Sequence, residues 1–238
     1  MSRRRPSRSL LAIALFLSAG CAKETTGFPP GVESWDDPAA APAEWPEMPS
    51  VPGTVALVTG GRLSTGTTPA YFWAHGRVTL AASIADVWSA IQWQPGVLLA
   101  VFPDTQVDCE PKVGVEAGYE VSFSVREIPN DFGDIGRANW FVVNWRADAT
   151  RDAAQAVQKV NVKAQKVDGT TYIPLMRQSI VVVAAPGGGS ALDIVRHINA
   201  RNESEVSAGD WIRLWVQALD AQVKGTREAL IPSSRCFP

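Results

Sequence analysis

Residues 78–91 read VTLAASIADVWSAI and join the end of a predicted strand to the start of a predicted helix. The segment from Tyr71 onward has enough aromatic and β-branched residues for a strand. Ser83, with Asp86 three places on, resembles a capping box, which starts a helix by satisfying its first backbone N–H groups. Apolar residues then recur at helical spacing, at Ile84, Val87, Trp88 and Ile91. The stretch therefore predicts a strand followed by a short amphipathic helix.

A series of strands is predicted after this helix. Pro95-Gly96 breaks the helix, and VLLAVF at 97–102 predicts a second short helical piece. In 115–126 apolar and polar residues alternate, which is typical of an antiparallel strand with one wet face. Similar strands are predicted at 138–147, 156–167, 174–185 and 191–200, with turns at Asp168-Gly169 and Gly187–Gly189. These five strands in succession predict a curved antiparallel sheet.

The last predicted element is a long amphipathic helix within residues 208–230. Its apolar residues fall on one narrow stripe, formed by Ile212, Trp215, Val216, Leu219 and Val223. Pro232 ends it. The stretch Gly60 to Thr68 is predicted to be a loop, so the first strand is expected near Tyr71.

This order of elements, with the local match VTLAASIADVWSAI, resembles the SRPBCC or START-like helix-grip superfamily. The resemblance covers about residues 71–230. It implies an α+β helix-grip fold, in which a curved antiparallel sheet wraps around a long C-terminal helix, with two short helices after the first strand. It also implies a cavity between sheet and helix that takes hydrophobic or amphipathic small molecules.

The N-terminus predicts an export signal and a lipid attachment site. Arginines at 3, 4, 5 and 8 precede an apolar run, Leu10 to Leu17, that is too short to span a bilayer. The run ends in SAGC at residues 18–21, which resembles the lipobox of bacterial lipoproteins. We therefore expect acylation of Cys21. Two or more fatty chains anchor a protein stably, so the acylated protein would stay at the membrane. An ordinary signal peptide with an incidental cysteine is the alternative.

Three segments follow from this reading: a signal peptide at 1–20, a tether rich in Pro and Ala at 21–53, and a domain at 54–238. In lipoproteins of this kind, an aspartate directly after the acylated cysteine favours retention in the inner membrane. This position is Ala22, so we expect the protein at the outer membrane, facing the periplasm. Trp35 and Trp45 are unusual in a tether. Three alternatives are open for them: docking on the domain, a position at the lipid interface, or exposure to solvent without a role.

Two further cysteines, Cys109 and Cys236, remain after Cys21. Leftover thiols in an oxidising compartment are often paired, and the helix-grip resemblance places these two segments near each other. We therefore predict a disulfide between them. Two unrelated thiols are the alternative.

Composition and motifs exclude several classes of function. A formal net charge of -2 argues against a nucleic-acid partner, and the one cationic cluster belongs to the signal. The chain has two histidines and lacks the HExxH, CxxC, Walker and GxSxG motifs. We predict no metal and no cofactor, and a non-enzymatic role is favoured over catalysis.

Candidate ligand-binding residues come from the sheet and the two helices. Strand alternation places Arg196 on one face with Leu192, Ile194 and Ile198, so it enters the cavity if the aliphatic residues do. An acidic neighbour or a position at the rim is the alternative. Arg177 raises the same question, whereas His197 with Asp193 resembles an exposed pair. The aromatic candidates, which core packing would equally explain, are Trp88, Tyr119, Phe123, Trp140 and Trp215, with Trp145 and Trp211 beside them.

Three functions remain open from the sequence. The first is a lipoprotein that binds a hydrophobic or amphipathic small molecule. The second is a cyclase-like, hydrolase-like or dehydratase-like enzyme that uses the same cavity, with Arg196 as its candidate polar residue. The third is an envelope scaffold with a filled core. The sequence leaves the oligomeric state undetermined.

Overall fold

The computed structural model describes residues 45–62, 70–92, 106–110, 120–128, 141–171, 173–199 and 205–225. In chain order the elements are β1 (Val55–Arg62), β2 (Tyr71–Leu80), α1 (Ile84–Ile91), β3 (Gln106–Glu110), β4 (Val121–Ile128), β5 (Phe141–Arg151), β6 (Val157–Gly169), β7 (Leu175–Ala184), β8 (Ser190–Asn199) and α3 (Glu205–Val223). The strands form one antiparallel sheet in the order β1-β2-β8-β7-β6-β5-β4-β3.

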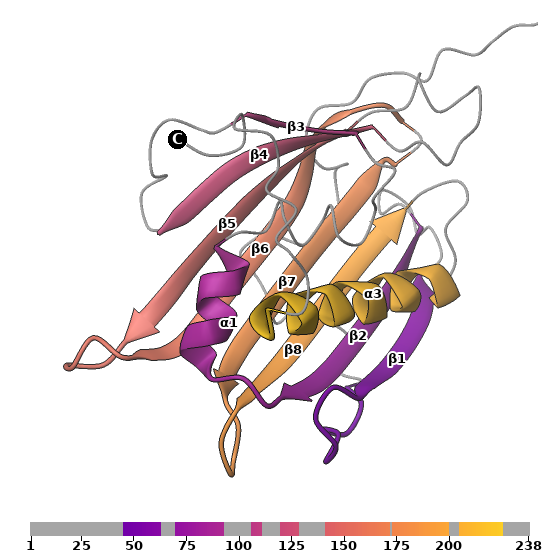
Figure 1. The fold of residues 1–238 in the computed structure, drawn as a ribbon. Helices are drawn as coiled ribbons and strands as arrows, with labels where there is room; N and C mark the ends of the chain where they lie inside the picture. The colour runs from indigo at the N-terminus through magenta and orange to yellow at the C-terminus, as the bar shows by residue number, and fades with distance from the viewer. Residues whose placement is uncertain are drawn as a thin grey trace, which may run out of the picture.

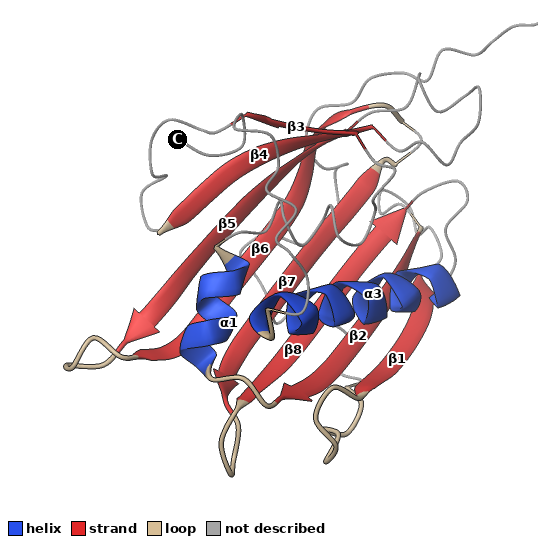
Figure 2. Ribbon diagram, viewed as in Figure 1, coloured by secondary structure: helices blue, strands red, loops and turns tan. Residues whose placement is uncertain are grey.

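Both described helices lie on one face of this curved sheet (Figures 1 and 2). The C-terminal helix α3 packs on β1, β2 and β8, whereas α1 packs on β6 and β7, and the two helices contact each other. We call the face that they cover the inner face, and the opposite one the outer face. The predicted fold class is confirmed: an α+β helix-grip arrangement with a curved antiparallel sheet and a long C-terminal helix.

The local signals at residues 83–91 are confirmed in detail. Ser83 is the N-cap of α1, and its side-chain oxygen accepts a hydrogen bond from the backbone N–H of Asp86 at 3.2 Å. The apolar side of the helix is buried through Val87, Trp88 and Ile91. The second predicted short helix, at 97–102, lies outside the described residues.

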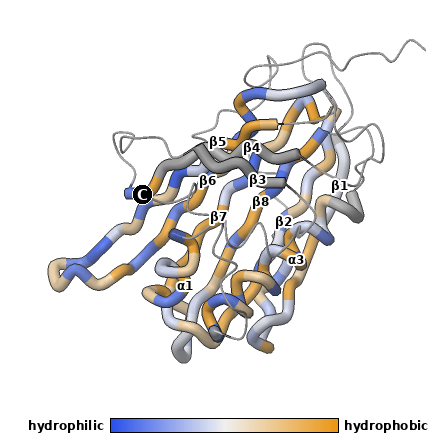
Figure 3. Tube along the Cα trace, turned by 45° about the horizontal axis from the view of Figure 1, so that its top comes forward, coloured by the Kyte–Doolittle hydropathy of each residue, from blue (hydrophilic) through white to orange (hydrophobic). Residues whose placement is uncertain are grey.

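The hydrophobic core lies between the inner face and the helices. In β5 and β6 buried and partly buried residues alternate. Hydrophobic and hydrophilic residues are interspersed along the strands of the sheet (Figure 3). From α3 the buried side chains are Trp211, Ile212, Trp215, Val216 and Leu219, so the predicted stripe is confirmed over most of its length. None of the helices that the structure describes is both long and apolar enough to cross a bilayer.

Strand β1 was not predicted, because its glycines suggested a loop beginning at Gly60. In the structure Gly60 and Gly61 pair with Trp73 and Phe72 of β2. The indole ring of Trp73 occupies the space that a Cβ on Gly60 would need. Gly60 therefore serves close side-chain packing within a strand and does not mark a turn.

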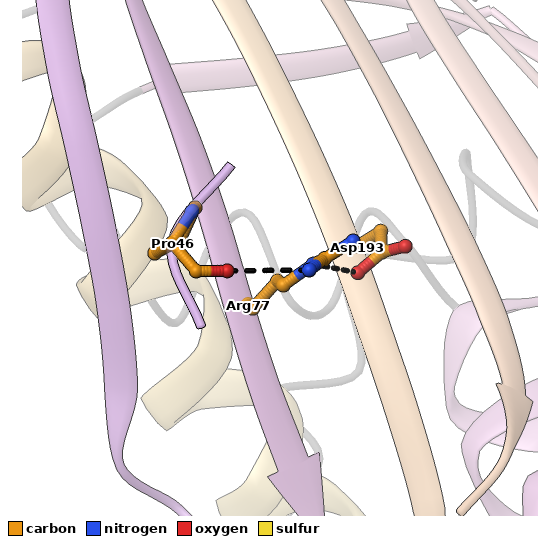
Figure 4. Close-up of polar contacts among 3 residues, drawn as sticks. All are labelled: Pro46, Arg77 and Asp193. Carbon is orange, nitrogen blue, oxygen red and sulfur yellow. Dashed lines mark hydrogen bonds and ion pairs between the residues drawn. The ribbon is translucent and has the colours of Figure 1, made fainter. Parts of the chain in front are cut away.

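Residues 45–53, which composition assigns to the tether, lie on the outer face of β2. The Pro46 carbonyl accepts a hydrogen bond from Arg77 Nη1 at 3.2 Å (Figure 4), and the Gly53 N–H donates to the Thr79 carbonyl at 2.7 Å. The Trp45 ring lies 4.8 Å from the ring of His75, between centroids. Of the alternatives for Trp45, docking on the domain is therefore the one observed, whereas Trp35 lies outside the described residues.

The cysteine predictions remain untested. Cys21 and Cys236 lie outside the described residues. Cys109 is in β3, where the backbone register places it opposite Val125 of β4. The lipid anchor and the disulfide therefore stay predictions.

Candidate functional site

The register of the sheet determines which side chains share the inner face. A Cβ built on Gly76 of β2 would lie 2.8 Å from Ile212 Cγ2 of α3, so Gly76 faces the helix. Successive residues of a strand point to opposite faces, and directly paired residues on neighbouring strands point to the same face. The even-numbered residues of β2, β7 and β8 therefore face inward.

One row across the inner face carries polar side chains. Its members are successive partners on β2, β8, β7, β6 and β5, namely Ala74, Arg196, Gln178, Ala164 and Trp145. All five are buried. The rows on either side in β7 and β8 are apolar, with Met176 and Ile198 on one side and Ile180 and Ile194 on the other. The row thus places two polar side chains, Arg196 and Gln178, on neighbouring strands within an apolar surface.

Arg196 lies where alternation predicted it, on the inner face with Leu192, Ile194 and Ile198. Only 4% of the residue is exposed, and the guanidinium carbon lies 4.1 Å from the centroid of the Trp211 ring in α3. A guanidinium over an aromatic face at this distance is a stabilising cation–π contact. The helix therefore holds the cation against the inner face.

Gln178 is a site residue that the sequence reasoning missed. It is 2% exposed, and neither Nε2 nor Oε1 has a hydrogen-bond partner among the described residues. An unsatisfied amide in a core costs about 1–3 kcal/mol per group, so its presence calls for an explanation. A detectable signal was present in the sequence, because Gln178 interrupts the apolar alternation of Met176, Ile180 and Val182.

Lys166 adds a second buried cation on the inner face of β6. Its Nζ donates a hydrogen bond to the Thr170 carbonyl at 3.0 Å, and only 1% of the residue is exposed. Burial lowers the pKa of Lys166 to about 8, and the charge of Asp168 opposes part of that shift. The amine therefore gives up its proton more readily than a surface lysine.

Arg177 does not belong to this site. It lies on the outer face of β7, where the register pairs it with His197 of β8 and Gln165 of β6. By strand alternation Arg177 shares this outer face with Leu175, which is also buried. Residues 175–178 are all buried, so at this end of β7 both faces are covered and apolar neighbours do not identify the inner one.

The prediction of an exposed His197–Asp193 pair is wrong. His197 is 2% exposed, and its ring stacks on Tyr71 at 5.0 Å and lies 6.2 Å from His75. Asp193 pairs instead with Arg77 at 2.9 Å. His197 thus belongs to an aromatic layer on the outer face, where Trp45 covers His75.

The aromatic candidates divide between core and undescribed residues. Trp88 and Trp215 are buried in the core between the inner face and the helices, together with Trp145 and Trp211. Trp211 and Trp215 stack along α3, with ring centroids 6.5 Å apart. Phe123 lies in β4 opposite Trp145 in the register, whereas Tyr119 and Trp140 lie outside the described residues. The inner face is therefore aromatic as well as aliphatic.

Within the described ranges no group of three or more His, Cys, Asp or Glu residues could hold a metal ion. The chemistry that the described inner face offers is hydrogen bonding by Gln178 and two cationic side chains, Arg196 and Lys166, within apolar surroundings.

Comparisons with solved structures find similar folds. The chain is similar to the Zhui aromatase/cyclase from Streptomyces sp. R1128, at 13% identity and a TM-score of 0.40, over 74% of this chain and 99% of that chain. It is also similar to a START superfamily protein from Mycobacterium smegmatis, at 11% identity and a TM-score of 0.42, over 65% and 99% of the two chains. The lipid transfer and protein localization domain of human StarD13 matches at 12% identity and a TM-score of 0.41, over 68% and 78%. No protein-family model and no curated protein matches the chain.

Proposed function

We propose that the protein binds a hydrophobic or amphipathic small molecule between the inner face of the sheet and the helices, and carries or senses it. The observation behind this proposal is the buried amide of Gln178, which has no partner among the described residues. A core that only supports a scaffold gains nothing from such a group, because an apolar residue of the same shape would avoid its desolvation cost. In a ligand-binding surface, the same amide can form hydrogen bonds with a polar group of the ligand.

The surroundings of Gln178 suit a mainly apolar ligand. Small-molecule sites are lined mostly by hydrophobic and aromatic side chains, with a few placed polar groups that fix orientation. The inner face has this composition, since the apolar Met176 and Ile180 flank Gln178 on β7 and Trp145 lies at the β5 end of the same row. Apolar contact would supply most of the affinity, and the polar row would set the orientation.

We further propose that the domain works at a membrane, held by lipid on Cys21 at the outer membrane and facing the periplasm. The support comes from the SAGC sequence after the apolar run and from the Pro-rich residues that follow. A Cys21→Ser variant would then lose its fatty acyl mass and move from the membrane to the soluble fraction. Unchanged fractionation and mass would contradict the anchor without touching the ligand proposal.

Native mass spectrometry of the full chain, purified from its own host, tests ligand binding. We expect a mass excess over the acylated polypeptide that organic extraction removes. A bare mass, together with no binding to a panel of lipids, would contradict the proposal and favour a scaffold with a filled core.

A further inference from the structure

We propose that the ligand carries an amide-type group, a carboxamide or lactam, that pairs with the side-chain amide of Gln178. This inference rests on the proposed function and names the ligand's polar part. It starts from one observation: at 2% exposure, both the donor and the acceptor of this side chain lack partners among the described residues.

The chemistry of the side chain selects the complement. A glutamine amide presents an N–H donor and a carbonyl acceptor side by side in one plane. A ligand amide presents the same two groups in reverse order, so the pair can form two parallel hydrogen bonds. A carboxylate only accepts and would set its charge against Oε1, while an ester or a tertiary amide leaves Oε1 without a donor. Only a group with a donor beside an acceptor satisfies both ends.

The neighbours of Gln178 in its row are compatible with such a partner. On β6 the opposite residue is Ala164, whose side chain ends at Cβ and cannot compete for the amide. On β8 the opposite residue is Arg196, held over the Trp211 ring at 4.1 Å. Directly opposed residues have Cβ atoms roughly 5 Å apart, so the guanidinium adds positive potential near a bound carbonyl oxygen. The guanidinium therefore favours a ligand amide whose carbonyl oxygen lies on the β8 side of Gln178.

The position of Gln178 between the helices also fits a ligand site. Helix α3 packs on β1, β2 and β8, whereas α1 packs on β6 and β7 (Figure 1). Gln178 is on β7, and β7 adjoins β8, so its row runs from the strands under α3 to the strands under α1. If the ligand amide lies at Gln178, the apolar part of the ligand can contact apolar core residues on either side.

A series of probes with one alkyl chain tests the inference by isothermal titration calorimetry on the full chain. The probes are dodecanamide, N,N-dimethyldodecanamide, methyl dodecanoate and dodecanoic acid. For the wild type we expect dodecanamide to bind about tenfold or more tighter than the dimethylamide and the ester, because each of these leaves a buried polar atom unpaired. Gln178→Leu should remove that preference while it keeps the affinity for the ester.

The chain offers a matched control, Gln165→Leu. Gln165 lies on β6, and the register places it on the outer face opposite Arg177. This variant should keep the wild-type preference for dodecanamide. Gln178→Met serves as a second variant, should Gln178→Leu fail to fold, and it should lose the preference in the same way.

Each outcome separates this inference from the proposed function. Equal affinity of the wild type for all probes, or an unchanged preference in Gln178→Leu, would contradict recognition of an amide-type group by Gln178. It would not contradict ligand binding itself. Tightest binding of dodecanoic acid that Arg196→Gln abolishes would replace recognition of an amide with recognition of an anion. If no probe binds, fragmentation of the native ligand decides: a ligand without an amide-type group overturns the inference, and no native ligand at all contradicts the proposed function too.

Discussion

Arg77 on β2 donates a hydrogen bond from Nε to Asp193 Oδ1 on β8 at 2.9 Å, and the same guanidinium binds the Pro46 carbonyl through Nη1 (Figure 4). Arg77 and Asp193 are directly opposite partners in the sheet. The guanidinium carbon also lies 5.0 Å from the centroid of the Trp45 ring. One side chain therefore links two strands of the sheet to the segment that precedes the domain.

Arg77→Gln should destabilise the protein more than Asp193→Asn. The ion pair is 30% and 37% exposed at its two side chains, so its loss alone should lower the free energy of unfolding by less than about 1 kcal/mol. Arg77→Gln also loses the Pro46 hydrogen bond and the Trp45 contact. Urea unfolding of both variants and of the double variant measures the difference. Equal losses would show that residues 45–53 gain nothing from Arg77.

Trp45→Ala should release residues 45–53 from the outer face. The ring contacts with His75 and Arg77 together should contribute about 1–2 kcal/mol, as aromatic and cation–π contacts usually do. Limited proteolysis before Gly53 should become faster, and the free energy of unfolding should fall. Met48→Ala is the control, because Met48 is 39% exposed in the same segment. Equal cleavage of the two variants would contradict the docking of Trp45.

Stability should depend on pH through Lys166. Burial lowers its folded-state pKa from 10.5 to about 8, so between these values the unfolded chain binds more protons than the folded one. The free energy of unfolding therefore rises with pH across this window, and the cost of burying the charge is fully present below pH 8. Lys166→Met removes this contribution. We expect the wild type to gain stability relative to that variant between pH 8 and 10.5, whereas a constant gap would contradict the shifted pKa.

Gly76→Ala should push α3 away from β2. Its Cβ would lie 2.8 Å from Ile212 Cγ2 and 3.1 Å from Leu57 Cδ2, and such overpacking costs about 1–3 kcal/mol. Combining it with Ile212→Ala should cost less than the sum of the two single changes. Gly209→Ala is the comparison at the same interface, where the nearest atom, Thr59 Cγ2, is 3.2 Å away and helix propensity favours alanine. A larger loss at Gly209 than at Gly76 would contradict this packing.

Gln178→Leu should stabilise the protein when no ligand is bound. It replaces an unsatisfied buried amide with an apolar side chain of similar size, and we expect a gain of about 1 kcal/mol or more. Thermal or urea unfolding of delipidated protein measures it. Gln165→Leu, at a half-buried position on the outer face, should change stability by less than about 0.5 kcal/mol. Destabilisation by Gln178→Leu would show that the amide has partners in the unliganded protein.

Much of the fold is encoded locally. The capping box at Ser83 and Asp86 starts α1 because both partners are three residues apart, and no distant contact is needed. The alternation in β5 to β8 and the stripe on α3 likewise depend only on neighbours in the chain. β1 was not predicted, because its pairing with β2 overrides the turn propensity of Gly60 and Gly61. This pairing joins separate segments of the chain, so it cannot be inferred from neighbouring residues.

The candidate site was predictable only in part. Alternation identified Arg196 as a companion of Ile194 and Ile198, but it could not reveal that Arg177 and His197 are buried on the other face. The outer face is covered there by contacts that the strand itself does not encode, such as Tyr71 stacking on His197. Gln178 became a candidate only when the register placed it beside Arg196 and Ala164.

Short-range patterns in the sequence were enough to predict the order of the elements and the residues that share each face of a strand, and the expected location at the outer membrane rests on such patterns alone. The tertiary structure decided which face the helices cover, which buried polar groups meet there and where the chain before the sheet docks. These depend on pairing and packing between residues as far apart as Arg77 and Asp193, and the local periodicity of the sequence does not encode such contacts.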